Sequence, residues 1–126
     1  MKSIEEISGY TDVPVVIADQ QGRITQVNQS FETVFGWRRQ EIIGQPLTVI
    51  IPKQLHDSHH LGFSRFLTTG AATLLNQPLS LKAVTKAGRE FEAEHTIVAE
   101  QRQGRWVFGA TIRPLDAASS QDATRT

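Results

Sequence analysis

The sequence has no cysteine, no excess of either charge and no long apolar run, and each absence excludes a class of protein. The lack of cysteine excludes disulfide frameworks, thiol catalysis, zinc ribbons, iron–sulfur clusters and photochemistry through a cysteine adduct. The 13 basic and 13 acidic residues give a formal net charge of zero. Nucleic acid is therefore disfavoured as a partner, because phosphate binding needs a basic surface. The longest apolar run, Val15–Ala18, is far shorter than the roughly 20 residues of a membrane span.

The same absences favour a cytoplasmic protein that is not an enzyme. Residues 1–12 contain Glu5, Glu6 and Asp12 and have no apolar stretch of the kind found in signal peptides. A chain without cysteine suits the reducing cytoplasm. The sequence shows no Ser-His-Asp set, no paired carboxylates and no glycine loop that could cradle a phosphate.

The length of 126 residues fits one domain. Within residues 1–12, Ile4 and Ile7 share a helical face, which predicts an N-terminal helical cap. Residues 13–115 carry the strand and helix patterns of the folded domain. Residues 116–126 are small and polar without apolar periodicity, so we expect a disordered tail or a linker.

The first half of the domain predicts a β-hairpin followed by short helices. A β-branched run and an alternating run flank the turn at Gly22, and Asn28 is placed to cap the next helix. Gly36 and Gly44 each end a short helical pattern. The predicted elements are strands over 15–18 and 23–27, helices over 29–35 and 38–43, and a longer helix over 53–69.

The second half changes to a period of two, which predicts three strands in a meander. Glutamates alternate along the middle strand and mark its solvent face, so Phe91, Ala93, His95 and Ile97 must face the core. In the last strand, Trp106, Phe108, Ala110 and Ile112 share one face. The whole pattern predicts an α+β fold, with a five-stranded antiparallel sheet, short helices and one longer helix packed on one face.

This order of motifs resembles the PAS domain over residues 13–115. The resemblance is carried by the hairpin at Gly22, by Asn28 with Phe31, by Phe35-Gly36-Trp37, by Glu41-Ile42-Ile43-Gly44, by Ala87-Gly88 before an aromatic strand, and by Arg113. It implies a sensory and dimerising module. Such domains hold a small ligand or cofactor, or none, between the sheet and the long helix.

A narrower resemblance lies in residues 51–59, IPKQLHDSH. They are similar to the haem-binding PAS domains of nitrogen-fixation oxygen-sensor kinases and of direct-oxygen-sensing phosphodiesterases. There, an Ile-Pro or Met-Pro pair precedes the proximal haem histidine at the spacing that His59 has here, and Arg65 matches an arginine near a haem propionate. The distal arginine and methionine of those sensors fall on Leu79 and Gln77. The resemblance thus implies haem b without the same oxygen chemistry.

The two central histidines each have two interpretations. His59 lies on an apolar helical stripe, where it fits either a core-edge histidine bonded to a backbone carbonyl or an axial haem ligand. Strand parity turns His95 inward, as a buried histidine bonded to a neighbouring strand or water, or as a distal ligand opposite His59. The predicted cofactor-binding residues are His59, His95, Arg65, Leu74, Leu79, Phe63, Ile97 and Phe108. The apolar members would equally form an ordinary core.

We predict a sensor domain that binds haem b, responds to a diatomic gas or to redox state, and signals through rearrangement of a homodimer. The residues around Ile4 and Ile7 are expected to contribute to that dimer, and an output domain of a larger signalling protein is expected to receive the signal. Two alternatives remain open: a cofactor-free dimerisation or protein-interaction module, and a PAS domain that binds flavin or a small metabolite.

Overall fold

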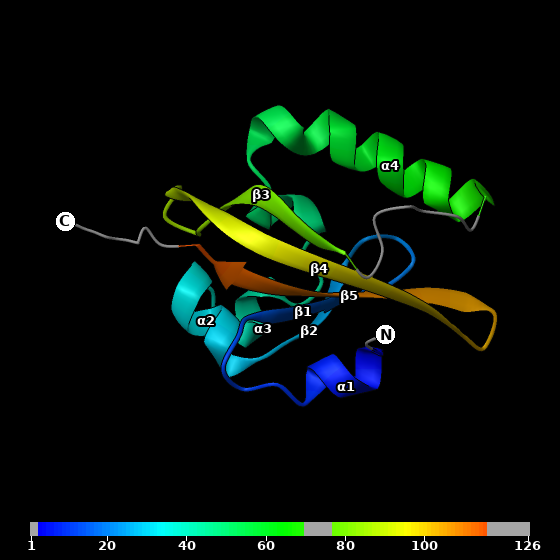
Figure 1. Cartoon of the computed structure of the whole chain (residues 1–126), viewed down its shortest axis with the longest axis horizontal. Helices are drawn as coiled ribbons and strands as arrows, with labels where there is room; N and C mark the ends of the chain where they lie inside the picture. The colour runs from blue at the N-terminus through cyan, green and yellow to red at the C-terminus, as the bar shows by residue number, and fades with distance from the viewer. Residues whose placement is uncertain (1–2, 70–76, 116–126) are drawn as a thin grey trace.

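A computed structural model describes residues 3–69 and 77–115, which form a five-stranded antiparallel sheet with helices on both sides (Figure 1). The sheet order is β2-β1-β5-β4-β3, so the N-terminal hairpin joins the C-terminal meander where β1 pairs with β5. The fold is the α+β architecture that the sequence predicts. The strands are β1 (Val15–Ala18), β2 (Ile24–Val27), β3 (Pro78–Val84), β4 (Glu90–Arg102) and β5 (Arg105–Pro114).

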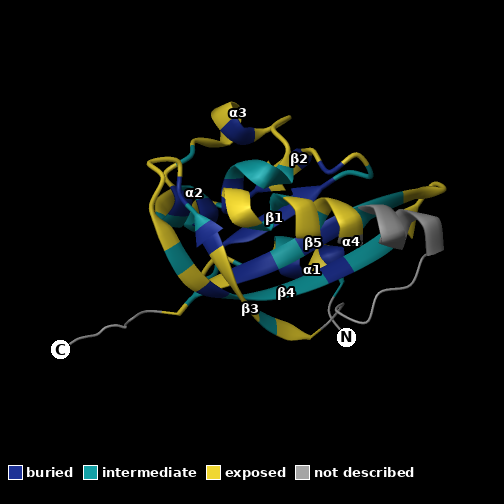
Figure 2. Cartoon of the chain, turned by 90° about the horizontal axis from the view of Figure 1, so that it is seen from above, coloured by how far each residue is buried: buried dark blue, intermediate teal, exposed yellow. Residues whose placement is uncertain are grey.

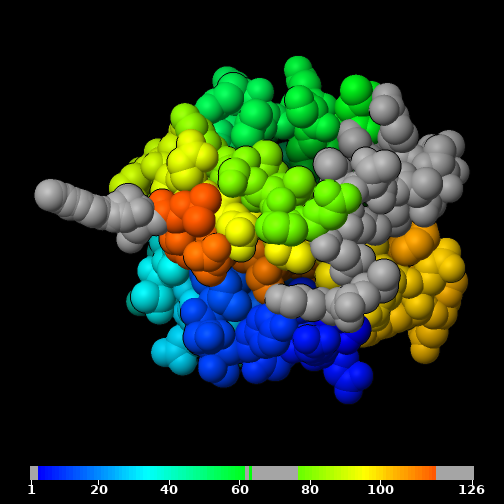
Figure 3. Space-filling view, in the orientation of Figure 1, coloured from blue at the N-terminus to red at the C-terminus, as the bar shows by residue number. Residues whose placement is uncertain are grey.

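The longest helix, α4, lies on one side of the sheet and the short helix α1 lies on the other (Figure 1). In Figure 3 the green atoms of α4 and the blue N-terminal atoms lie at opposite edges of the view, with the strands between them. Within the described ranges, no helix is long and apolar enough to cross a membrane. The helices are α1 (Ile4–Ser8), α2 (Gln29–Phe35), α3 (Arg39–Ile42), the 3₁₀ turns η1 (Leu47–Ile50) and η2 (Lys53–Leu55), and α4 (His56–Thr69).

Asn28 caps α2, as predicted, and also ties the N-terminal segment to the sheet. Its Oδ1 accepts hydrogen bonds from the amides of Phe31 at 3.0 Å and Val15 at 2.9 Å. Its Nδ2 donates to the carbonyls of Tyr10 at 3.0 Å and Val13 at 2.8 Å. One side chain thus fixes the start of α2, the start of β1 and the connection from α1.

The main core lies between the inner face of the sheet and helices α2 and α3. Phe31 and Phe35, four residues apart on α2, stack with ring centroids 4.3 Å apart and are fully buried. On the sheet side, Ala83 and Ala93 are also fully buried. The buried members of this core are Val16, Ile24, Val27, Phe31, Phe35, Ile42, Ile50, Ala83, Ala93 and Ile112.

A second core lies on the outer face, where the sequence indicates a solvent-facing side. Ile4 and Ile7 of α1 pack there against Val15, Ile17 and Val98. Because both isoleucines are buried against the chain's own sheet, they are not exposed for the dimer contact expected of them. The glutamates at either end of β4 do mark this face, but α1 covers its middle.

Gly109 makes the close approach of α1 possible. A Cβ at this position would lie 2.8 Å from the Cδ1 atoms of both Ile4 and Ile7, closer than packed carbon atoms can stand. The first amide of α1 is bonded as well, because Ile4 N donates to Glu100 Oε2 at 2.9 Å. The position of α1 is therefore fixed by close packing against Gly109 and by one hydrogen bond to Glu100.

Candidate functional site

The predicted cofactor residues for which side chains are described lie in one layer, between α4 and the inner face of the sheet. His59 and Phe63 come from α4. In the strands, Leu79 pairs with His95, and Ile97 pairs with Ala110. Arg65 lies on α4 but its side chain is outside the described part of the chain, and Leu74 lies outside it altogether.

His56 anchors the start of α4. Its Nε2 lies 2.7 Å from the carbonyl oxygen of Ile51 and 3.1 Å from that of Thr48. Both partners only accept, so Nε2 carries the proton and donates to them. His60, by contrast, is exposed. Neither histidine is thus placed to offer a nitrogen to the interior.

His59 does offer a nitrogen to the layer. Its ring is half-buried and stacks on Phe63, with centroids 5.8 Å apart. Burial lowers the pKa of His59 below its usual value, and the neighbouring His60 and His56 lower it further. Among the described residues, its ring nitrogens have no hydrogen-bond partner. At neutral pH it is therefore an uncharged imidazole with a free lone pair, the form that binds iron.

His95 is held in the complementary way on β4. Its Nδ1 lies 3.3 Å from the carbonyl oxygen of Ala93, an acceptor, so the proton is on Nδ1 and the lone pair is on Nε2. The half-buried ring has a lowered pKa, because the desolvation of the charged form outweighs this hydrogen bond. His95 is thus a second neutral imidazole with a nitrogen available.

The contact between Phe63 and Phe108, at 4.9 Å between centroids, gives the register of α4 over the sheet. Phe108 pairs with Ala99 of β4, and α4 and β4 run in the same direction (Figure 1). One helical turn back from Phe63 is about 6 Å, and two strand residues back from Ala99 are about 7 Å. One turn back along α4, His59 is thus displaced from the Phe63–Phe108 contact toward the part of β4 that holds Ile97 and His95.

The inner face beneath α4 is not fully covered. The side chains of this strip are only partly buried, and Figure 2 shows the middle of β4 in the colour of intermediate burial. Further along the same strands, Ala93 and Ile112 are 0% and 1% exposed. The half-covered strip consists of Leu79, His95, Ile97, Ala99 and Ala110.

This donor set fits a haem better than a bare metal ion. No group of three or more His, Cys, Asp or Glu side chains gathers to hold a metal within the described ranges. A haem iron needs only one or two ligands from the protein, because the macrocycle supplies the rest. Two neutral imidazoles and an apolar, half-covered strip meet that requirement.

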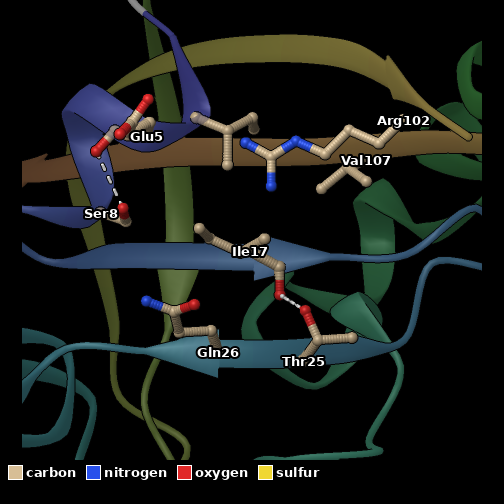
Figure 4. A pocket seen from close by; sticks show the side chains of 8 residues that line it. Glu5, Ser8, Ile17, Thr25, Gln26, Arg102 and Val107 are labelled. Carbon is tan, nitrogen blue, oxygen red and sulfur yellow. Dashed lines mark hydrogen bonds between the residues drawn. The ribbon is translucent and has the colours of Figure 1, made fainter.

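A hollow of about 610 Å³ on the outer face is less suited to a ligand (Figure 4). Ser8 Oγ donates to Glu5 O and Thr25 Oγ1 donates to Ile17 O. Arg102 pairs with Glu100 at 3.3 Å. These polar groups at the hollow already bond within the chain. The hollow is lined by Ile4, Glu5, Ser8, Ile17, Thr25, Gln26, Arg102 and Val107.

One residue of the inner layer was not predicted from the sequence. Gly22 belongs to the β1–β2 turn, and the side of Gly22 on which a Cβ would stand faces the edge of the Phe63 ring. A turn glycine gives no sequence signal of such a contact, because the partner lies on a distant helix.

The comparisons with known proteins agree with this architecture. A family model described as PAS domain matches residues 12–120. An uncharacterized protein of Azorhizobium caulinodans is 35% identical over 102 residues, which cover 80% of this chain and 14% of that protein. Sensor protein FixL of Bradyrhizobium diazoefficiens is 25% identical over 101 residues, which cover 80% of this chain and 20% of that protein. The chain thus spans a fifth or less of these relatives.

Solved structures of low sequence identity share the fold. The PAS domain of a Colwellia psychrerythraea protein superposes with a TM-score of 0.67 at 18% identity, covering 82% of this chain and 87% of that one. The Rhodobacter sphaeroides LOV protein superposes with a TM-score of 0.65 at 12% identity, covering 84% of this chain and 61% of that one. The family model, the fold and the motif order lead to one conclusion: the chain belongs to the PAS domain family.

Proposed function

We propose that this sensory domain binds haem b between α4 and the inner face of the sheet, with His59 as the proximal ligand. The observation that carries the proposal is the half-buried His59 imidazole, whose pKa is lowered by burial and whose ring stacks on Phe63, the residue that contacts Phe108 of the sheet. The resemblance of residues 51–59 to haem-binding oxygen sensors supports it, as does the similarity to a protein named as a sensor.

Each residue of the layer has a distinct part. His59 would offer the iron a ring-nitrogen lone pair, since burial lowers the pKa of the imidazole and favours its neutral form. Leu79, Ile97 and Phe108 contribute apolar contacts and exclude water, and Arg65 is the proposed partner of a propionate. When bound, the haem supplies an iron that takes a diatomic ligand or changes oxidation state.

His95 is the candidate distal ligand. Its Nδ1–H donates to Ala93 O, so Nε2 would be the nitrogen available to hold the iron. A gas or a redox change would then compete with His95 for its position. The strand pair β4 and β5, which holds His95, would then pass the change onward as a shift of population.

We further propose that the chain works as the sensor module of a larger cytoplasmic signalling protein. It spans 14% and 20% of the two relatives above, which leaves room in such proteins for an output domain. The module would act as a homodimer, without enzymatic activity of its own, and without binding nucleic acid or membrane. The boundaries 1–12, 13–115 and 116–126 remain the predicted division of the chain.

Haemin titration followed by absorbance tests the proposal. The parent chain should give a sharp Soret band at one haemin per chain, and His59→Ala should lose it. His60→Ala is the matched control, since it removes the exposed neighbouring imidazole, and should keep the band. His95→Ala should keep the haem and shift from six- to five-coordinate features. Equal binding by the parent and His59→Ala would overturn the proposal.

The same samples separate the alternatives. A yellow chromophore in the purified chain would favour flavin, in line with a light-oxygen-voltage domain of the same fold whose mechanism was probed with a flavin analogue. With no cysteine in the chain, such a flavin could not form a cysteine adduct. A colourless chain that binds neither group and tolerates His59→Ala would favour the interaction module.

A further inference from the structure

We infer that Phe63 is the positioning residue of this site, holding the His59 ring in place and coupling α4 to the sheet through Phe108 and the β1–β2 turn. The role in sensing rests on the proposed function. The coupling itself is a property of the chain without cofactor.

The orientation of the His59 ring depends on what its two faces and its nitrogens contact. A histidine that binds a metal usually donates its second ring nitrogen to a carboxylate, carbonyl or water, and this bond sets the ring plane. Within the described ranges, His59 makes no such bond. Toward the sheet, the His59 ring stacks on the ring of Phe63, one turn along α4, with an interplanar angle of 26°. The phenyl ring therefore sets the plane of the imidazole, as a hydrogen bond does in other metal-binding histidines.

Phe63 continues this contact into the sheet. Its ring centroid lies 4.9 Å from that of Phe108, and Phe108 in turn lies 6.4 Å from Trp106. Phe108 is only 8% exposed, so it has little room to yield. Four aromatic rings thus form one column from α4 to β5, consisting of His59, Phe63, Phe108 and Trp106.

The edge of the Phe63 ring also meets the β1–β2 turn. A Cβ on Gly22 would lie 3.7 Å from Phe63 Cζ, and Gly22 has a φ of +80°. The turn is firm, because Asp19 Oδ1 accepts from the amides of Gln21 and Arg23 at 3.0 Å. Phe63 therefore rests on two fixed surfaces, and its size sets how close α4 comes to the sheet.

The column of rings is linked to the outer face through the peptide bond between Phe108 and Gly109. Phe108 faces α4, and its neighbour Gly109 faces Ile4 and Ile7 of α1. A shift of Phe63 that moves Phe108 thus displaces the backbone on which α1 sits. Packed contacts of this kind can carry coupling between sites.

The test compares Phe63→Leu with the matched control Phe91→Leu. Phe91 lies in β4 on the inner face of the sheet, and its ring contacts Phe35 of α2. In the apo chain, His59→Ala should shift the amide NMR signals of Gly22 and Phe108. The shifts should fall by more than half in the Phe63→Leu background and persist in the Phe91→Leu background. Undiminished shifts with Phe63→Leu would overturn the inference.

A second readout uses the haem-loaded chain. Phe63→Leu retains His59, and its haem-loaded form should show broader ferric electron paramagnetic resonance lines than the parent chain, because the imidazole takes several orientations. Phe91→Leu should keep narrow lines. Unchanged lines in Phe63→Leu would count against the inference. Phe63→Met, which fills the space without a ring, replaces Phe63→Leu if the leucine variant unfolds. A chain that binds no haem would overturn the proposed function alone, since the apo readout still decides the coupling.

Discussion

The two faces of the sheet are covered by helices of very different length, and the shorter one makes the tighter seal. The five-residue α1 leaves Ile4, Ile7 and Val98 at most 2% exposed. The 14-residue α4 leaves His95 and Ile97 beneath it half-buried. Two contacts explain the difference. Gly109 has no side chain, so α1 can lie close to the outer face. The Phe63 ring rests on Phe108 and Gly22, so α4 lies further from the inner face. The outer face under α1 is thus closely packed, whereas the strip under α4 leaves space for the ligand that we propose.

Truncating one isoleucine on each face gives the largest expected contrast. Ile7→Ala should lower the free energy of unfolding by about 3 kcal/mol, because it opens a cavity in a sealed core. Ile97→Ala should lower it by about 1 kcal/mol, because that side chain is already partly in water. Urea denaturation measures both. Equal losses would mean that the faces do not differ.

Adding one methyl group to the outer face tests the fit of α1. Gly109→Ala should destabilise the chain by about 1–3 kcal/mol, because the new carbon overlaps Ile4 and Ile7. Gly9→Ala is the control, since its Cβ would meet only Glu6 O, at 3.6 Å. Hydrogen exchange at the Ile7 amide should speed up in Gly109→Ala and not in Gly9→Ala. A neutral Gly109→Ala would refute the close seating of α1.

Acid should weaken the fold through the inner face. The pKa of His95 is lowered in the folded chain by burial, whereas the unfolded chain titrates near 6.5. The unfolded state therefore binds more protons as the pH falls through about 6.5, so stability falls with it and is full above that pH. His95→Leu should flatten this slope in denaturation curves, while Phe91→Leu should keep it. An unchanged slope in His95→Leu would contradict the assignment.

The smallest effect is expected from the polar contact of α1. Glu100→Ala removes the acceptor of the Ile4 amide and should cost about 1 kcal/mol. Glu94→Ala, which removes an exposed ion pair with Arg113, should cost less than that. We expect hydrogen exchange at the Ile4 amide to become faster in Glu100→Ala and to stay unchanged in Glu94→Ala. Equal effects of the two variants would assign no special role to Glu100.

Most of the fold could be predicted because its signals are local. Alternation assigned the face of each residue in β4 and β5, and the Asn28 cap and Gly36 stop bounded α2. The position of α1 could not be predicted, since Ile4 and Ile7 show that one helical face is apolar but not which surface it covers. Two residues gave a partial indication of where α1 lies. Val98 is apolar and Gly109 has no side chain, and both lie on the outer face that the glutamates of β4 mark.

The faces on which the candidate residues lie could be predicted, but the openness of the strip could not, and their role in binding stays a prediction. The resemblance of residues 51–59 to haem-binding sensors singled out His59, and strand parity predicted that His95 faces inward. Alternation is the same for a packed interior and for a half-covered one. The difference depends on how high α4 stands above the sheet, and that height is set by Phe63 against Gly22, a contact between residues distant in the sequence.

Binding of the ligand beneath α4, and not beneath α1, can be tested directly with haemin. Ferric haemin is paramagnetic, so it broadens the NMR signals of nearby amides. Binding beneath α4 predicts broadening at His95, Ile97 and Ala110 on the inner strip, with narrow signals retained at Ile4, Ile7 and Glu5 beside the outer hollow. Broadening centred on α1, or spread evenly over both faces, would contradict it.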